Sequence, residues 1–312
     1  MRPIPSVLST TGLAVLVSLS GCVLSLDGSA PPPIEDLEPG PPMFAALGPG
    51  DDGVGAAVII MDADGDVIRR LPTGNSSSPW EEWSMSWHPD KGVFLVSENS
   101  NVLWSVQAST GEVVEYGSAE LVLNGLSRNA GLPDGGVLIV QGDRLYQTNA
   151  DEELVQTWES EDAGVTWSDV VAHESAGMIL LASDGGVRVF VTDERLGGFD
   201  GFVDSMGQDG GGAIWGASTS GGPVGWFTPG GETMSLGEPS ELGLLRKAMS
   251  FEPLPEEDAV WVLSADGYAE DEPNSRLSVL TRSGDVTDLF ETDEWWLDFA
   301  VVSGLLLDEA SP

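Results

Sequence analysis

The chain has 312 residues, with 51 acidic and 12 basic side chains and a formal net charge of −39. This charge excludes proteins that bind nucleic acid or an anionic membrane surface through clustered Lys and Arg. The apolar share of 41% is enough to form a core, so the acidic composition does not indicate a disordered chain. The single cysteine excludes disulfides within the chain and zinc sites built from cysteines.

Residues 1–21 have the layout of an export signal peptide. Arg2 is their only charge, and the apolar stretch 12–19 is shorter than the about 20 residues that span a bilayer. Residues 19–22, Leu-Ser-Gly-Cys, resemble the lipobox of bacterial lipoproteins. The resemblance implies cleavage before Cys22, lipid attached to this cysteine, and a membrane anchor. We therefore expect an exported lipoprotein, most simply of the outer membrane, on its periplasmic or surface face.

Residues 22–45 are predicted to form a lipidated tether. Prolines at 31–33 and 41–42 favour extended backbone, and the segment has no helical or strand period. The remaining residues, 46–312, are predicted to form one domain.

The domain shows an internal repeat of two short apolar runs joined by a polar turn, best seen at 58–68. Six such turns are centred on residues 65, 111, 152, 194, 231 and 284. Their mean spacing is about 44 residues, which is typical of a four-stranded propeller blade. The sequence thus predicts an all-β fold, a six-bladed β-propeller.

A second family of apolar runs precedes the repeated turns, at 92–96, 136–140, 177–181, 212–215, 259–263 and 303–307. Such runs are typical of strands packed on both faces between neighbouring blades. Because the chain ends after one of these runs and the domain starts before a turn, the last blade is expected to combine strands from both termini. We expect its first two strands in 297–308 and its last two in 56–71.

Two turns resemble those of known propeller families. Residues 87–95, Trp-His-Pro-Asp-Lys-Gly-Val-Phe-Leu, resemble the repeat of TolB-type propellers, and residues 132–138 resemble the turn of NHL and gluconolactonase-like propellers. The resemblance implies the architecture and not an activity, since propellers host many functions. Residues 160–167 match the Asp-box of sialidase-type propellers once, and we interpret them as a local turn between blades.

Three aspartates are candidates for a metal site in the central channel. Asp169, Asp204 and Asp298 are predicted on inner strands, and gluconolactonase-like enzymes bind a divalent metal with channel carboxylates and an Asn. Calcium is the cofactor to consider, and Asp62, Asp64 and Asp66 could also offer it oxygens. A solvated β-turn is the preferred interpretation of these last three.

The remaining candidates are histidines and tryptophans. His88 and His173 occupy equivalent positions in two blades, and we interpret them as rim residues satisfied by water rather than as a metal pair. Two tryptophan clusters fall in neighbouring blades and could bind a glycan or peptide, or pack in the core. Their candidate ligand-binding members are Trp83, Trp87, Trp295 and Trp296.

These patterns favour a non-catalytic binding or scaffolding domain at the cell envelope, with an envelope protein or a glycan as partner and no nucleic acid. The alternatives are a metal-dependent hydrolase or lactonase, and a glycan-binding module. No G-x-S-x-G motif supports serine nucleophile chemistry.

Overall fold

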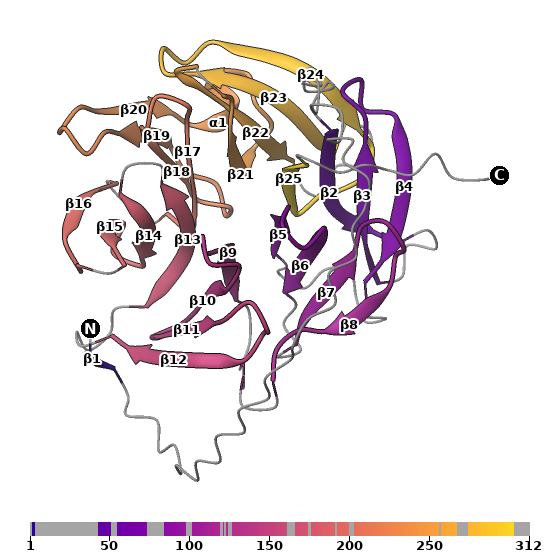
Figure 1. Cartoon of the computed structure of the whole chain (residues 1–312). Coiled ribbons are helices and arrows are strands. Elements are labelled where there is room, and N and C mark those ends of the chain that lie inside the picture. Colours follow the sequence, from indigo (N-terminus) through magenta and orange to yellow (C-terminus); the bar gives the residue numbers. More distant parts are fainter. Residues whose placement is uncertain are drawn as a thin grey trace, which may run out of the picture.

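Six antiparallel sheets surround a central channel in the computed structural model (Figure 1). The structure describes residues 43–50, 55–73, 84–97, 102–118, 121, 123, 127–160, 166–173, 176–190, 192–199, 203–255, 257–266 and 274–302, and the backbone of 2–3. Apart from the backbone of 2–3, the predicted signal peptide lies outside this set, as do Cys22 and most of the predicted tether. The predicted six-bladed β-propeller is confirmed.

The first three blades follow one another along the chain. Blade 1 contains β5 (Ser84–His88), β6 (Val93–Ser97), β7 (Leu103–Gln107) and β8 (Val113–Glu115). Blade 2 contains β9 (Arg128–Gly131), β10 (Val137–Gln141), β11 (Arg144–Thr148) and β12 (Leu154–Glu159), and β12 also pairs with β1 (Arg2–Pro3). Blade 3 contains β13 (Trp167–His173), β14 (Gly177–Ala182), β15 (Gly186–Val189) and β16 (Arg195–Gly198).

The other three blades complete the ring. Blade 4 contains β17 (Ser205–Gln208), β18 (Ile214–Ala217), β19 (Val224–Phe227) and β20 (Thr233–Gly237). Blade 5 contains β21 (Lys247–Pro253), β22 (Ala259–Ala265), β23 (Ser275–Thr281) and β24 (Val286–Thr292), and the one-turn helix α1 (Pro239–Leu242) precedes it. The closing blade contains β25 (Asp298–Val302), β2 (Met43–Pro49), β3 (Ala56–Met61) and β4 (Val67–Pro72). No helix within the described residues is long and apolar enough to cross a membrane.

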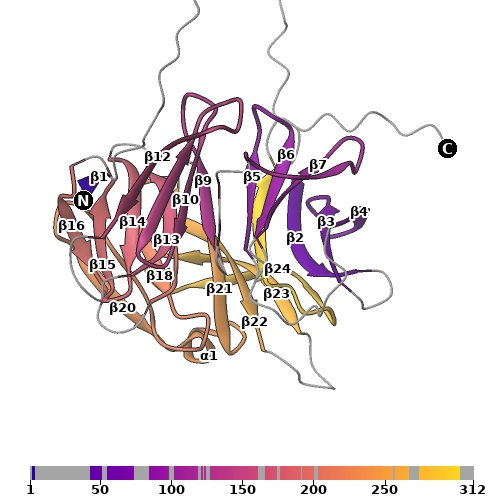
Figure 2. The same cartoon turned by 90° about the horizontal axis from the view of Figure 1, so that it is seen from below.

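The first strand of each blade lines the channel. These inner strands contact one another around the ring, and Figure 2 shows β5 and β9 running from one face of the disc toward the other. Gly207 illustrates how closely inner strands approach: a Cβ atom there would lie 2.6 Å from the carbonyl oxygen of Phe251 on β21. Any side chain at this position would therefore push β17 away from its neighbour.

Apolar second strands supply most of the core. The predicted runs at 92–96, 136–140, 177–181, 212–215 and 259–263 are confirmed as β6, β10, β14, β18 and β22. Every residue of β6, β18 and β22 is buried, because these strands have a neighbouring blade on each face. The six apolar clusters of the core lie between successive blades.

The predicted turns coincide with left-handed backbone. Positive φ angles occur at Gly65 (86°), Gly111 (76°), Glu152 (66°), Asp193 (57°), Gly231 (97°) and Gly284 (90°). Each joins the third strand of a blade to the fourth, and only the turn predicted at 194 is displaced, by one residue. Four of the six are glycines because glycine adopts this conformation without a Cβ clash.

The closing blade differs from the prediction in its second strand. Residues 43–49 form β2, which pairs with β25 on one side and β3 on the other, so this blade takes one strand from the C-terminal end and three from the N-terminal end. The run at 303–307 lies outside the described residues. The domain therefore begins within the segment predicted as tether, since Phe44, Ala45, Ala46 and Leu47 are buried like any other second strand.

Candidate functional site

Four charged side chains line the central channel, which encloses a cavity of about 480 Å³. Arg128 comes from β9, Asp169 from β13, Glu252 from β21 and Asp298 from β25. The strands β5 and β17 contribute only uncharged residues to the lining. Three carboxyl groups thus share the channel with one guanidinium group.

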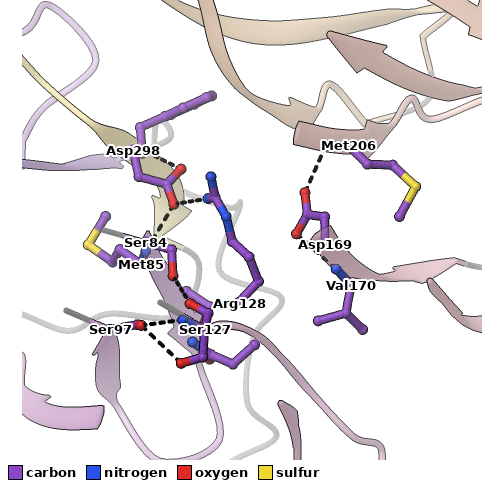
Figure 3. Close-up of polar contacts among 12 residues, drawn as sticks. Ser84, Met85, Ser97, Ser127, Arg128, Asp169, Val170, Met206 and Asp298 are labelled. Atoms are coloured by element: carbon purple, nitrogen blue, oxygen red, sulfur yellow. Dashed lines mark hydrogen bonds and ion pairs between the residues drawn. The ribbon is translucent and has the colours of Figure 1, made fainter. Parts of the chain in front are cut away.

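Asp298 joins three blades through its two oxygens (Figure 3). Oδ1 accepts the N–H of Phe299, and Oδ2 accepts both the N–H of Met85 on the next inner strand (2.9 Å) and Nη1 of Arg128 (2.9 Å). The carboxylate is almost fully buried, with 3% of the residue exposed. Burial raises the pKa of Asp298, although Arg128 and the N–H donors act against this effect.

Asp169 repeats this arrangement at another blade junction (Figure 3). Oδ1 accepts the N–H of Val170, and Oδ2 accepts the N–H of Met206 on the next inner strand, both at 2.8 Å. Burial raises the pKa of Asp169 to about 6, while the Arg128 charge and these two N–H groups oppose the rise. Both aspartates therefore link neighbouring inner strands.

A hydroxyl group takes the place of the carboxylate between blades 1 and 2. Ser84 Oγ donates to the carbonyl oxygen of Ser127 (2.6 Å), and the Ser127 hydroxyl is bonded to Ser97 Oγ (2.9 Å). A polar link between inner strands is therefore a recurring element of this channel.

Asp204 is not part of the channel lining. Its carboxylate accepts hydrogen bonds from the N–H (2.6 Å) and hydroxyl (2.8 Å) of Thr219. Because it precedes β17, it fastens the start of this strand to the β18–β19 turn. The structure thus brings two of the three predicted aspartates to the channel and places the third elsewhere.

A larger hollow of about 1080 Å³, which we call the cleft, lies where β5, β9 and β13 end. The apolar side chains that line it include Trp87, Leu132, Trp158, Met178 and Phe190. The polar side chains that line it include His88, Asp90, Lys91, Gln147, His173 and Asp193. Trp87 and Gly131 line both the cleft and the channel, so the two hollows meet at the channel mouth.

The two histidines line this cleft, but the protein engages Nε2 of His88 and both ring nitrogens of His173. His88 Nε2 lies 3.0 Å from Ser86 Oγ and 3.4 Å from Asn129 Oδ1. His173 accepts the N–H of Ala176 at Nδ1, and its Nε2 lies 3.1 Å from the carbonyl oxygen of Gly212. The interpretation as rim residues satisfied by water is wrong, because both are buried at blade junctions, with 6% and 4% exposure.

Burial lowers the pKa of His88, and the Lys91 charge adds to this effect against the opposing influence of Asn129 and Asp90. A neutral imidazole therefore faces the cleft at neutral pH.

The tryptophans of the two predicted clusters mostly pack inside the protein. Trp87 lies 4.7 Å from Phe94 between ring centroids, and Trp87 and Trp295 both pack against the core between the closing blade and blade 1. Trp296 is 3% exposed and contacts Phe290. Trp83 lies outside the described residues. Only Trp87 of the four reaches the cleft within the described structure.

The segment around Asp62 forms a hydrogen-bonded turn. The N–H groups of Asp64 (3.0 Å) and Asp66 (2.9 Å) both donate to Asp62 Oδ1. This side chain therefore caps its own turn. In the described parts of the chain, no three His, Cys, Asp or Glu side chains are grouped so that they could hold a metal ion.

Sequence reasoning missed the channel residues Arg128, Asn129 and Glu252 and the cleft aromatics Trp158 and Phe190. Arg128 and Asn129 precede the predicted second strand at 136–140, so applying to this blade the spacing that placed Asp169 on an inner strand would have found them. Trp158 and Phe190 come from blades 2 and 3, lie 4.8 Å apart between ring centroids, and meet only in the folded protein.

These features define the class of protein: a six-bladed β-propeller whose channel mouth opens into a cleft on one face. The sequence matches no protein-family model and no curated protein. Among solved structures it is similar to a protein of unknown function from Bacteroides caccae, with TM-score 0.59, 12% identity, and coverage of 84% of this chain and 99% of that one.

Two enzymes are also similar in fold. A streptogramin B lyase gives TM-score 0.54 and 11% identity, over 86% of this chain and 95% of the other. A catalytically inactive variant of virginiamycin B lyase from Staphylococcus aureus, solved with quinupristin, gives TM-score 0.54 and 12% identity, over 81% and 85% of the two chains. At these identities the similarity shows the propeller fold alone.

Proposed function

We propose that this chain is a lipid-anchored protein of the bacterial cell envelope whose propeller binds a ligand in the cleft. The export-like segment 1–21, Cys22 and the proline-rich stretch after it support the anchor. The observation that carries the binding function is the cleft itself, which is lined by both aromatic and polar side chains beside the channel mouth. Concave sites of this size with mixed walls are the usual places where small molecules and peptides bind.

Replacing Trp158 with alanine is expected to weaken ligand binding about tenfold, because the indole supplies apolar contact area in the cleft. Screening a library of aromatic fragments, short peptides and oligosaccharides by ligand-observed NMR would supply the ligands to be measured. Trp104→Ala removes a half-buried tryptophan outside the cleft and should leave affinity unchanged. If no library member binds, or if both variants lose binding equally, the cleft is not the binding site.

Replacing Cys22 with serine is expected to abolish lipid attachment completely and to leave the signal peptide uncleaved, because serine lacks the sulfur that carries the lipid. Mass spectrometry of the N-terminus, with and without globomycin, would measure both effects. Ser25→Ala should be processed normally. A mature wild-type protein without lipid on Cys22 would contradict the proposed anchor.

An enzyme acting at the channel mouth is the second candidate. Ser86 borders the channel, and its Oγ lies 3.0 Å from His88 Nε2 while donating its proton to Asn129 Oδ1. A hydroxyl beside an imidazole is an arrangement that nucleophilic catalysis uses, provided that the hydroxyl first turns from Asn129 to His88. The lyases with this fold, one of them solved with quinupristin, also favour testing for turnover. A panel of esters, lactones and quinupristin, assayed with calcium and with EDTA, would detect it, and His88→Ala should abolish any turnover that depends on this pair.

A metal-dependent hydrolase using Asp169, Asp204 and Asp298 has less support than a binding protein. Asp169 and Asp298 already accept hydrogen bonds at both of their oxygens, and Asp204 is bound to Thr219. A glycan site built on the predicted tryptophan clusters has less support as well, because Trp296 is buried.

A further inference from the structure

The charges in the channel are unevenly distributed. Arg128 is bound to Asp298 and also lowers the pKa of Asp169 through its charge. Glu252 has no such partner, since no described residue donates a hydrogen bond to its carboxyl or forms an ion pair with it. Burial and the nearby carboxyls of Asp298 and Asp169 raise the pKa of Glu252 to about 8. An unpaired carboxyl group that lines a channel beside two other carboxyl groups is stabilised in its ionised form by a cationic group of a bound ligand.

Asn129 is an independent sign of a ligand. Its side chain borders the channel, the residue is 7% exposed, and its Nδ2 has no hydrogen-bond partner among the described residues, although Oδ1 contacts Ser86 and His88. Buried donors in native proteins are nearly always paired, so this N–H group calls for an acceptor such as a carbonyl or hydroxyl oxygen. A metal ion would not satisfy it.

The cleft extends the same site outward. Because Trp87 and Gly131 line both hollows, a ligand with its polar end in the channel would place its next atoms in the cleft, beside aromatic side chains that line it. A ligand that complements the channel would therefore carry a positive charge for Glu252 and an acceptor oxygen for Asn129. A ligand that complements the cleft would carry an apolar group.

We propose that the channel binds the protonated primary amine of a ligand, next to a carbonyl or hydroxyl oxygen, while the apolar part of the ligand lies in the cleft. The inference rests on the proposed binding function and deepens it. The amine pairs with the Glu252 carboxylate, and the neighbouring oxygen accepts the Asn129 N–H. An N-terminal dipeptide with apolar side chains has this chemistry.

Phe-Phe amide is a suitable probe, and its N-acetylated form is the neutral control. By isothermal titration calorimetry, the wild-type protein should bind the free amine at least about tenfold more tightly than the acetylated form, because the charge pair forms away from bulk water. Glu252→Gln should remove this difference and leave affinity for the acetylated form unchanged. Glu257→Gln makes the same chemical change at an exposed position outside the channel and should bind like the wild type.

Proton release provides a second measurement. At pH 7 the Glu252 carboxyl is mostly protonated, and pairing with an ammonium group lowers its pKa, so binding should release a proton to the buffer. Titrations in buffers of different ionisation enthalpy would measure this release. The amine of the probe, whose own pKa is about 8, takes up part of this proton when it binds as an ammonium group. The net release should therefore be positive but below one proton at pH 7, fall toward zero near pH 8, and be lost in Glu252→Gln. The other charged groups lining the channel are Arg128, Asp169 and Asp298, and they remain in all variants.

Equal affinity for the two probes, or full amine affinity in Glu252→Gln, would overturn the inference. Absence of binding of the free amine to the wild type would also overturn it, whatever the library screen finds, whereas the cleft itself is decided by that screen and by Trp158→Ala. Thermal denaturation of each variant would verify that it is folded.

Discussion

Replacing Asp209 with alanine is expected to lower the free energy of unfolding by about 3–5 kcal/mol, because it leaves a buried ion pair with one partner. The Asp209 side chain is fully buried (0% exposed) and accepts hydrogen bonds from Arg282 Nε and Nη2, both at 2.7 Å. The Asp209 carboxylate also accepts hydrogen bonds from Trp215 Nε1 and from the N–H of Ala213, both at 2.9 Å. Asp209 follows β17 in blade 4 and Arg282 follows β23 in blade 5, so the ion pair joins these two blades. The Arg282 guanidinium also lies 5.3 Å from the ring centre of Trp226 in blade 4.

Urea denaturation at pH 7 would measure this loss, and Asp258→Ala is the matched control. Asp258 lies 3.2 Å from the same guanidinium, but its side chain is 69% exposed, so its removal should cost only about 0–1 kcal/mol. A similar loss of unfolding free energy in both variants would show that burial of Asp209 does not determine how much it stabilises the protein.

The Asp209 pair also predicts a pH dependence. Burial alone would raise the Asp209 pKa, but the hydrogen bonds from Arg282, Trp215 and Ala213 and the Arg282 charge hold it below its usual value. A carboxyl group with a lowered pKa in the folded state stabilises the protein above its unfolded pKa. This stability is lost as the pH falls through the folded pKa, and Asp209→Ala should lack that part of the acid dependence.

Replacing Phe44 with alanine is expected to destabilise the protein by about 3–5 kcal/mol, because it leaves a cavity beside the closing blade. Phe44 is 2% exposed on β2, and its ring lies 5.5 Å from Trp261 and 5.9 Å from Phe290 between centroids. The cavity would therefore open between the closing blade and blade 5, where the ring of blades is joined.

Val67→Ala is the control for this prediction, since Val67 lies in the same blade on β4 but is 48% exposed. Its effect should stay within about 0.5 kcal/mol, as for most surface substitutions. Equal denaturation midpoints for Phe44→Ala and the wild type would contradict the placement of β2 in the closing blade.

The sequence repeat did not predict that β2 is the second strand of the closing blade. The other five second strands open after a recognisable turn, whereas β2 follows a proline pair in a segment that looks like a linker. Its apolar run is short and rich in alanine, so the run at 303–307 matched the repeat better. The distinction depends on which strand pairs with β25, and the β2–β25 pairing joins segments about 250 residues apart in the chain.

The candidate site shows a similar limit. Asp169 and Asp298 were predicted on inner strands because of their spacing from the second strand of the same blade. Asp204 was predicted from the same spacing as Asp169 but lies one residue before β17, and its carboxylate is bound to Thr219. A one-residue change reverses the face of a strand, so spacing alone could not separate the three.

Local properties of the chain were enough to predict the all-β class, the six blades and the positions of their turns, because strand period and left-handed turns depend on residues that are close in sequence. The folded structure was needed to establish which strand closes the ring, which carboxyl groups share the channel, and that Trp158 and Phe190 meet at the cleft. These features depend on contacts between blades, whose energy comes from burial and hydrogen bonding between residues far apart in the sequence.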